Sequence, residues 1–235
     1  MVRASVESPA VVPQPAVSGS RLSLAQRRRQ LIDAARRVFA ERGFRGATTR
    51  QIATNAGVTE ALIFQHFPDK DSLYAAILDE EADRSRIEDW LAEIEGYKAA
   101  GADEAVIRCL YTRLITHHES DPDLIRLIVF SALENHPLAQ QIHGRATRIH
   151  KFLEAFIADR QCRGRFRPGS PAVLARATLA MPVYYILQRH LFKMPSSPVT
   201  TAEIIDEGVA FTLAGLRDVT GTAAPSWQSE EVVSP

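Results

Sequence analysis

The sequence predicts an all-α protein with a small N-terminal bundle followed by a larger C-terminal one. Apolar residues recur at intervals of three, four and seven from Leu24 onward, with arginines on the other faces. No β-hairpin signal or internal repeat stands out. Beyond residue 85 the segments between breakers run to roughly 15 to 28 residues, a length usual in helical bundles. The 46% of apolar residues is enough to fill a core.

Capping residues predict four helices in the first part of the chain. Gly43 can end the first helix in a left-handed cap, and Gly57 allows a tight turn between the second and third. Thr48 and Thr59 can cap the helices that follow them, and Asp69 or Asp71 can cap a fourth. The expected helices span 24–43, 48–56, 59–66 and a fourth segment to about residue 85.

Breaker residues divide the remainder, and composition marks both ends of the chain. Breaks are expected at Gly96, Gly101, Asp121-Pro122, His136-Pro137, 164–171 and 195–198. The Pro- and Ser-rich ends predict disordered segments. The expected parts are therefore a disordered arm 1–23, a helix-turn-helix domain 24–85 with its motif at 48–67, a C-terminal domain 86–220 and a disordered tail 221–235.

Charge is distributed unevenly although the formal net charge is zero. Residues 21–70 hold ten Lys/Arg against four Asp/Glu, and the rest of the chain holds 18 against 24. A basic N-terminal third is typical of a nucleic-acid module joined to another domain. The two cysteines form no disulfide framework, and no apolar run is long enough to span a membrane, so a cytoplasmic location is expected.

Residues 48–66 have the pattern of a helix-turn-helix, in which the second helix lies in the major groove. The inward positions are Ile52, Ala53, Val58, Leu62 and Ile63. On the outside, the hydroxyls of Thr48, Thr49 and Thr59 can reach phosphates beside helix-start amides, and Arg50 and Lys70 can add charged phosphate contacts. Gln65 has the amide that pairs with adenine but can equally reach a phosphate, and Ala61 can touch a thymine methyl.

The chain resembles the TetR (tetracycline-repressor-like) family of transcriptional regulators over roughly residues 24 to 85. The matching stretches are RRRQLIDAARRVFAERGFRGATT, RQIATNAGVTEALIFQHF and PDKDSLYAAIL. The resemblance implies backbone contacts from Thr48, Thr59, Phe64, His66 and Lys70, and base contacts from Glu60, Ala61 and Gln65. Two residues depart from the family pattern: Phe64 stands where Tyr is common, and Glu60 places a carboxylate near DNA.

The same resemblance implies a homodimer that binds a palindromic operator, represses transcription and releases DNA when a small molecule binds. A regulator or activator without a ligand is the alternative. An enzyme or ligand carrier is disfavoured, because no convergent set of acid, base or metal residues is readable. No cofactor is expected, and the histidines lack the spacing of a metal site.

Candidate residues for the C-terminal domain come from polar and aromatic side chains within apolar helices. A small, largely apolar effector is expected to meet Arg113, His117, Phe130, Asn135, His136, Arg148, Met181, Tyr184 and Tyr185. Family members pair through their last two long helices, here 171–193 and 200–219. The expected dimer residues are Leu174, Leu179, Val183, Leu187, Leu191, Ile205, Val209, Phe211, Leu213 and Leu216.

Overall fold

The structure is a computed structural model that describes residues 22–136, 139–194 and 199–217, without the side chains at 82–85, 139–143 and 145. Most of the expected arm, residues 1–21, and all of the expected tail lie outside the described residues. Within these, the all-α prediction is confirmed: helices account for the regular structure, and the one β-bridge joins Phe166 to Arg217. The elements are α1 Leu24–Gly46, α2 Thr49–Ala56, α3 Glu60–His66, α4 Lys70–Ser85, α5 Ile87–Ala99, α6 Asp103–Ser120, α7 Leu124–Leu133, α8 Ala139–Cys162, α9 Pro171–Ile186, the π-helical segment η1 Leu187–Leu191 and α10 Thr201–Leu216.

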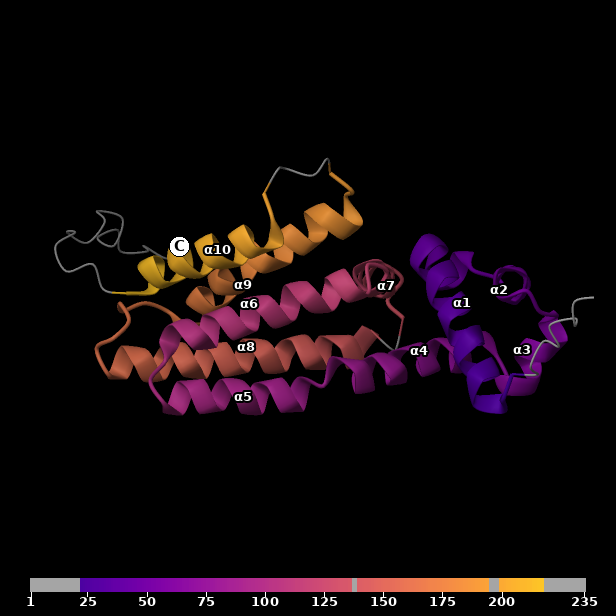
Figure 1. The fold of residues 1–235 in the computed structure, drawn as a ribbon, viewed down its shortest axis with the longest axis horizontal. Helices are drawn as coiled ribbons and strands as arrows, with labels where there is room; N and C mark the ends of the chain where they lie inside the picture. Colours follow the sequence, from indigo (N-terminus) through magenta and orange to yellow (C-terminus); the bar gives the residue numbers. More distant parts are fainter. Residues whose placement is uncertain (1–21, 137–138, 195–198, 218–235) are drawn as a thin grey trace, which may run out of the picture.

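Helices α1, α2 and α3 form a head at one end of an elongated molecule, and α4 leads from it into the body (Figure 1). The predicted caps are confirmed: Thr48, Thr59 and Asp69 each accept a backbone N–H at the start of a helix, and Gly57 is left-handed. The break expected at Gly43 is also present, with φ 71°, although one further helical turn follows it to Gly46.

The head is held together by apolar side chains from α1 to α4, and α7 of the body contributes to the same core. Phe39 and Tyr74 meet edge to face at 5.0 Å, and Leu127 of α7 is buried in this cluster. Glu134, just after α7, accepts the backbone N–H of Phe44 at 2.9 Å. The head is therefore docked on α7 as well as joined to the body through α4.

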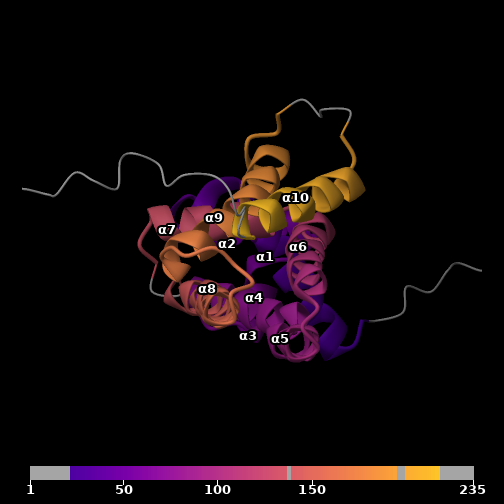
Figure 2. The same cartoon turned by 90° about the vertical axis from the view of Figure 1, so that its left-hand side faces the viewer.

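In the body, α6 lies between α5 on one side and the α9–α10 pair on the other, with α8 packed against α9 (Figures 1 and 2). Helix α9 runs through Pro182, which cannot donate to the carbonyl one turn back. That carbonyl belongs to Thr178, and the buried Tyr111 hydroxyl of α6 donates to it at 2.7 Å. The carbonyl that Pro182 leaves without a helical donor thus accepts a hydrogen bond that holds α9 against α6.

One expected boundary in the body differs from the structure. Gly96 lies inside α5, because one glycine costs a helix only about 1 kcal/mol and the packed face of α5 compensates. The end expected for the fourth helix at about residue 85 is confirmed, since α4 ends at Ser85 and Arg86 adopts φ 43° before α5. Among the described helices, none is long and apolar enough to cross a membrane.

Candidate nucleic-acid interface and ligand cavity

The outer face of α3 is presented to solvent at the tip of the head (Figure 1). Ile63 is buried against α1 and α2, which fixes the rotation of this short helix. Ala61, Phe64 and Gln65 are then exposed on its other side, and His66 is half-buried at its end. Phe64 is half exposed, which is unusual for a side chain of its size. The structure therefore leaves the predicted base-facing positions Ala61 and Gln65 accessible.

Glu60 is held within the head rather than directed freely outward. The Thr49 hydroxyl at the start of α2 donates to its Oε1, and the Glu60 side chain is half-buried. The carboxylate that seemed unfavourable near DNA thus has a partner that sequence reasoning did not consider. The same bond engages the Thr49 hydroxyl that was expected to reach a phosphate.

Lys70 also has partners inside the head. Its Nζ donates to the carbonyl oxygens of Phe44 at 2.7 Å and Ala47 at 3.0 Å, and it lies 4.3 Å from the centroid of the Phe44 ring. Unpaired carbonyls at the end of a helix need such donors. Lys70 therefore closes the end of α1, a role not predicted from the sequence.

The arginines of the head divide into buried and available ones. Arg36 was expected on an outer face of the first helix, but its side chain is 6% exposed and pairs with carboxylates. Arg28 lies over the Phe67 ring at 4.7 Å, and Arg27 donates to Gln30. Arg50, on α2 beside the caps of the recognition unit, is exposed and has no side-chain bond to another described residue.

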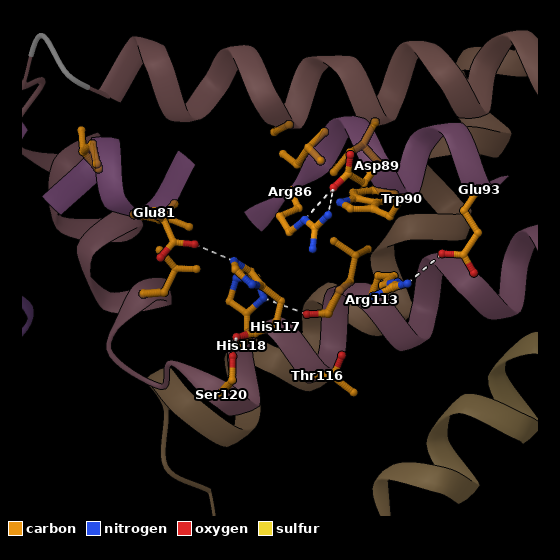
Figure 3. A pocket seen from close by; sticks show the side chains of 17 residues that line it. Glu81, Arg86, Asp89, Trp90, Glu93, Arg113, Thr116, His117, His118 and Ser120 are labelled. Atoms are coloured by element: carbon orange, nitrogen blue, oxygen red, sulfur yellow. Dashed lines mark hydrogen bonds and ion pairs between the residues drawn. The ribbon is translucent and has the colours of Figure 1, made fainter. Parts of the chain in front are cut away.

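A cavity of about 640 Å³ opens in the body among α4, α5, α6, α7 and α8. Trp90 and Ile149 are buried apolar members of its wall. Polar side chains enter from α4, α5 and α6, as Figure 3 shows for Glu81, His117 and His118. A space of this size, mainly apolar with a few directed polar groups, is typical of a small-molecule site.

One carboxylate joins this cavity to the head. Glu81 near the end of α4 has Oε1 2.6 Å from His117 Nε2 and Oε2 3.2 Å from the Arg36 guanidinium. Arg36 Nη1 also pairs with Asp121, which follows α6. Burial alone would raise the pKa of Glu81, but His117 and Arg36 outweigh it and lower that pKa. An ionised, buried carboxylate therefore connects α1, α4 and α6.

Two of the nine predicted effector residues, Arg113 and His117, line this cavity. The other seven predicted residues do not line this cavity, because tertiary packing places those side chains elsewhere. Phe130 lies against Gly43, Asn135 is exposed, and His136 is buried on the Phe44 ring at 4.3 Å. Of the rest, Arg148 pairs with Glu88 outside, Met181 contacts Gly208, Tyr184 is exposed and the Tyr185 hydroxyl meets Thr201.

The predicted dimer residues are also redistributed by the packing of α9 and α10. Six of the ten are buried within the protomer, where they cannot face a second copy: Leu174, Leu179, Ile205, Val209, Leu213 and Leu216. Leu187 and Leu191 are half-buried against the same core. Only Val183 and Phe211 are exposed, 40% and 78%, together with Val173 and Tyr184, which were not in the predicted set.

Comparison with known proteins identifies the head. A family model described as "Bacterial regulatory proteins, tetR family" matches residues 31–77. The N-terminal domain is a TetR-family DNA-binding domain. The chain is 43% identical over 70 residues to the HTH-type transcriptional repressor AcnR of Corynebacterium diphtheriae, covering 30% of this chain and 36% of that protein. It is also 43% identical over 65 residues to the HTH-type transcriptional activator FasR of Mycolicibacterium smegmatis, covering 28% and 30%.

The chain spans about a third of the length of these two relatives. The fold is shared more widely. AibR, whose crystal structure contains isovaleryl coenzyme A and operator DNA, superposes with a TM-score of 0.61 at 24% identity, over 79% of this chain and 97% of that one. This likeness shows that the chain, including its body, shares the fold of that protein.

Proposed function

We propose that the protein is a transcriptional regulator that binds a palindromic DNA site as a homodimer and releases it when a small molecule occupies the body cavity. The observation that carries this proposal is the TetR-family head with the free outer face of α3. An α-helix of this kind fits the major groove, and the preceding helix lies over the phosphates. The exposure of Arg50 near the start of α2 supports such phosphate contacts.

The size of the recognition unit and the surface of α9 and α10 both support a dimer. One short helix covers few base pairs, so two heads about 34 Å apart, one turn of DNA, are needed for a palindrome. Val173, Val183 and Tyr184 of α9 and Phe211 of α10 offer exposed apolar side chains on adjacent helices. Contiguous exposed apolar surface is typical of an interface, so these two helices are the proposed pairing surface. The partner proposed for this surface is a second copy of the chain.

Release of DNA requires that a ligand distinguishes two arrangements of the heads. The Glu81 carboxylate supports such coupling, because it bonds His117 in the cavity wall and Arg36 in the head. A ligand that moves His117 or α4 changes the environment of Arg36 and hence the angle of α1. Repression is the favoured direction, and activation is the alternative that the similarity to FasR keeps open.

The test is recovery of genomic DNA fragments by the purified full-length protein at two salt concentrations. One or a few palindromic fragments, lost at high salt, are the expected result, because phosphate contacts release counterions. The Arg50→Ala variant is expected to recover them more weakly. Uniform weak recovery of all fragments, or no recovery, would count against specific regulation. An enzyme or carrier would recover none.

A further inference from the structure

The charged side chains in the cavity wall are already paired with one another. Arg113 of α6 lies 2.7 Å from Glu93 of α5, and Arg86 lies 2.5 Å from Asp89 (Figure 3). Both described guanidiniums of the wall therefore have a carboxylate partner. Glu81 adds a third carboxylate, so the acids outnumber the arginines there. An anionic ligand would have to displace one of these partners.

The two hydroxyl groups of the wall already donate their hydrogens to backbone carbonyl oxygens. Thr116 donates to the carbonyl of Thr112, and Ser120 donates to the carbonyl of His117, each at 2.7 Å. A hydroxyl has one hydrogen and two lone pairs. Both oxygens can therefore still accept a hydrogen bond, but neither has a hydrogen left to offer a ligand.

The His118 ring likewise uses a hydrogen to bond a backbone carbonyl. Its Nδ1 lies 2.9 Å from the carbonyl oxygen of Leu114, which can only accept, so Nδ1 carries the hydrogen. Burial lowers the pKa of His118 below its ordinary value, so the ring is neutral near pH 7. In a neutral ring with the hydrogen on Nδ1, Nε2 is an acceptor. The end of the cavity near His118 and Ser120 thus offers acceptors.

We propose that the cavity takes an apolar molecule that is not an anion and that carries a hydrogen-bond donor, such as a hydroxyl or an amide N–H. This inference rests on the proposed function, in which the cavity is the effector site. The apolar body would lie against Trp90, Leu114 and Ile149. The donor would meet the acceptors of His118 and Ser120. An anionic group would lose its water and gain no free cation, which is unfavourable in a partly buried site.

Three dyes that share one aromatic skeleton test this chemistry. N-phenyl-1-naphthylamine is uncharged and has one N–H donor, its 8-sulfonate adds an anion, and its N-methyl derivative lacks the donor. Trp90 in the wall can transfer excitation energy to a bound dye, and Trp227→Phe removes the second tryptophan, which lies outside the described residues. In that background the parent dye is expected to bind about ten-fold more tightly than the sulfonate and several-fold more tightly than the N-methyl derivative.

Two matched variants on α5 distinguish dye binding in the cavity from dye binding elsewhere on the surface. Glu93→Gln removes the partner of Arg113, so affinity for the sulfonate should rise about ten-fold while affinity for the parent dye stays within about two-fold. Glu88→Gln removes a carboxylate from the same helix, where it pairs with Arg148 outside the described wall, and should change neither. Equal responses of the two variants would overturn the assignment to this cavity.

Three other results would contradict the proposal. Sulfonate binding as tight as that of the parent dye would refute the exclusion of anions. Equal binding of the N-methyl derivative would refute the need for a donor. Absence of energy transfer from Trp90 with every dye would refute binding in the cavity. Failure of the proposed regulatory function would give a different result. The dyes would then bind with the predicted preferences, but their binding would not change the affinity of the protein for a recovered DNA fragment.

Discussion

The Arg36 guanidinium of α1 and the Glu81 carboxylate of α4 form an ion pair of 3.2 Å in which the two side chains are 6% and 5% exposed. The other oxygen of Glu81 lies 2.6 Å from His117 in the cavity wall. The head and the cavity therefore share a single buried carboxylate. Because charges in such a place are costly to leave unpaired, the pair makes the position of α1 sensitive to what happens at His117.

Replacing Arg36 is expected to destabilise the protein strongly. Arg36→Met would leave Glu81 and Asp121 without their shared cation, which costs about 3–5 kcal/mol for a buried pair. The neighbouring Arg37→Met is the control, since Arg37 is exposed and bonds only Asn55 at 3.2 Å among the described residues. Urea unfolding of both variants measures the difference. Similar midpoints for the two would argue against a structural role for the Arg36 network.

The Glu81 carboxylate also predicts a dependence of stability on pH. His117 and Arg36 hold its folded pKa below the unfolded value of about 4.3, despite the opposing effect of burial. The stabilisation from Glu81 is therefore present above that unfolded value and is lost as pH falls through the folded pKa. Unfolding free energies of the wild type and of Glu81→Gln are compared between about pH 6 and pH 3. The variant should lose less stability over this range. Parallel curves of unfolding free energy against pH would contradict the prediction.

Gly43 is expected to be intolerant of any side chain. Its φ of 71° is unfavourable for other residues, and a Cβ there would lie 2.5 Å from Glu134 Oε1 and 3.0 Å from the Phe130 ring. Gly43→Ala should lower the free energy of unfolding by more than about 1–2 kcal/mol, the backbone cost alone. Gly46→Ala is the matched control, because its Cβ would meet only Arg42 at 3.5 Å. Thermal unfolding in which both variants behave alike would contradict this.

Arg50 and Gln65 should affect DNA binding in different ways. Arg50→Ala is expected to weaken binding to all sequences and to reduce the slope of log K against log salt by about 1. Gln65→Ala should instead change which sequences bind, at about 1–3 kcal/mol for the affected base pair. Fluorescence anisotropy with a recovered fragment and single-base variants of it measures both. An equal loss on every sequence would exclude base reading by Gln65.

Lys70→Ala and His66→Ala are likewise expected to weaken binding to every sequence, but Lys70 also closes the end of α1. Since its Nζ satisfies the carbonyls of Phe44 and Ala47, removing it should lower the stability of the head as well. Unfolding curves recorded beside the anisotropy data separate the two effects. Lost DNA binding with an unchanged unfolding midpoint would mean that Lys70 acts mainly at the phosphate.

The exposed surface of α9 and α10 should control self-association. Phe211→Glu replaces an exposed apolar side chain of α10 with a charge, so it should shift a dimer toward monomer at micromolar concentration. Leu133→Glu, at an equally exposed position at the end of α7, should leave the dimer intact. Sedimentation equilibrium measures the association constants. A wild-type monomer at micromolar concentration would exclude the dimer proposed here.

Local signals predicted the head well because its elements depend on residues close in sequence. The hydroxyls of Thr48 and Thr59 and the left-handed Gly57 determine where α2 and α3 begin and end. Arg36 and Glu81 were missed, although a sequence signal existed. Arg36 follows Ile32 by four residues on the buried face of α1, and Glu81 follows Ile77 by four on the buried face of α4. Two opposite charges on buried faces predict an ion pair.

The cavity could not be predicted in the same way. Its wall is assembled from five helices, so a residue such as Trp90 looks like ordinary core until the helices are placed. The same limit applies to α9 and α10, where Leu213 and Phe211 are both apolar but face opposite ways. The rotation of a helix about its axis is decided by tertiary packing when apolar residues occur on more than one face.

Specific DNA recognition is tested most directly by the affinity of the full-length protein for a recovered palindromic fragment and for a scrambled fragment of equal length, measured across a salt series. The proposed function predicts that the palindrome binds at least about a thousand-fold more tightly and that both affinities fall steeply with salt. Equal affinity for the two fragments at every salt concentration would contradict it.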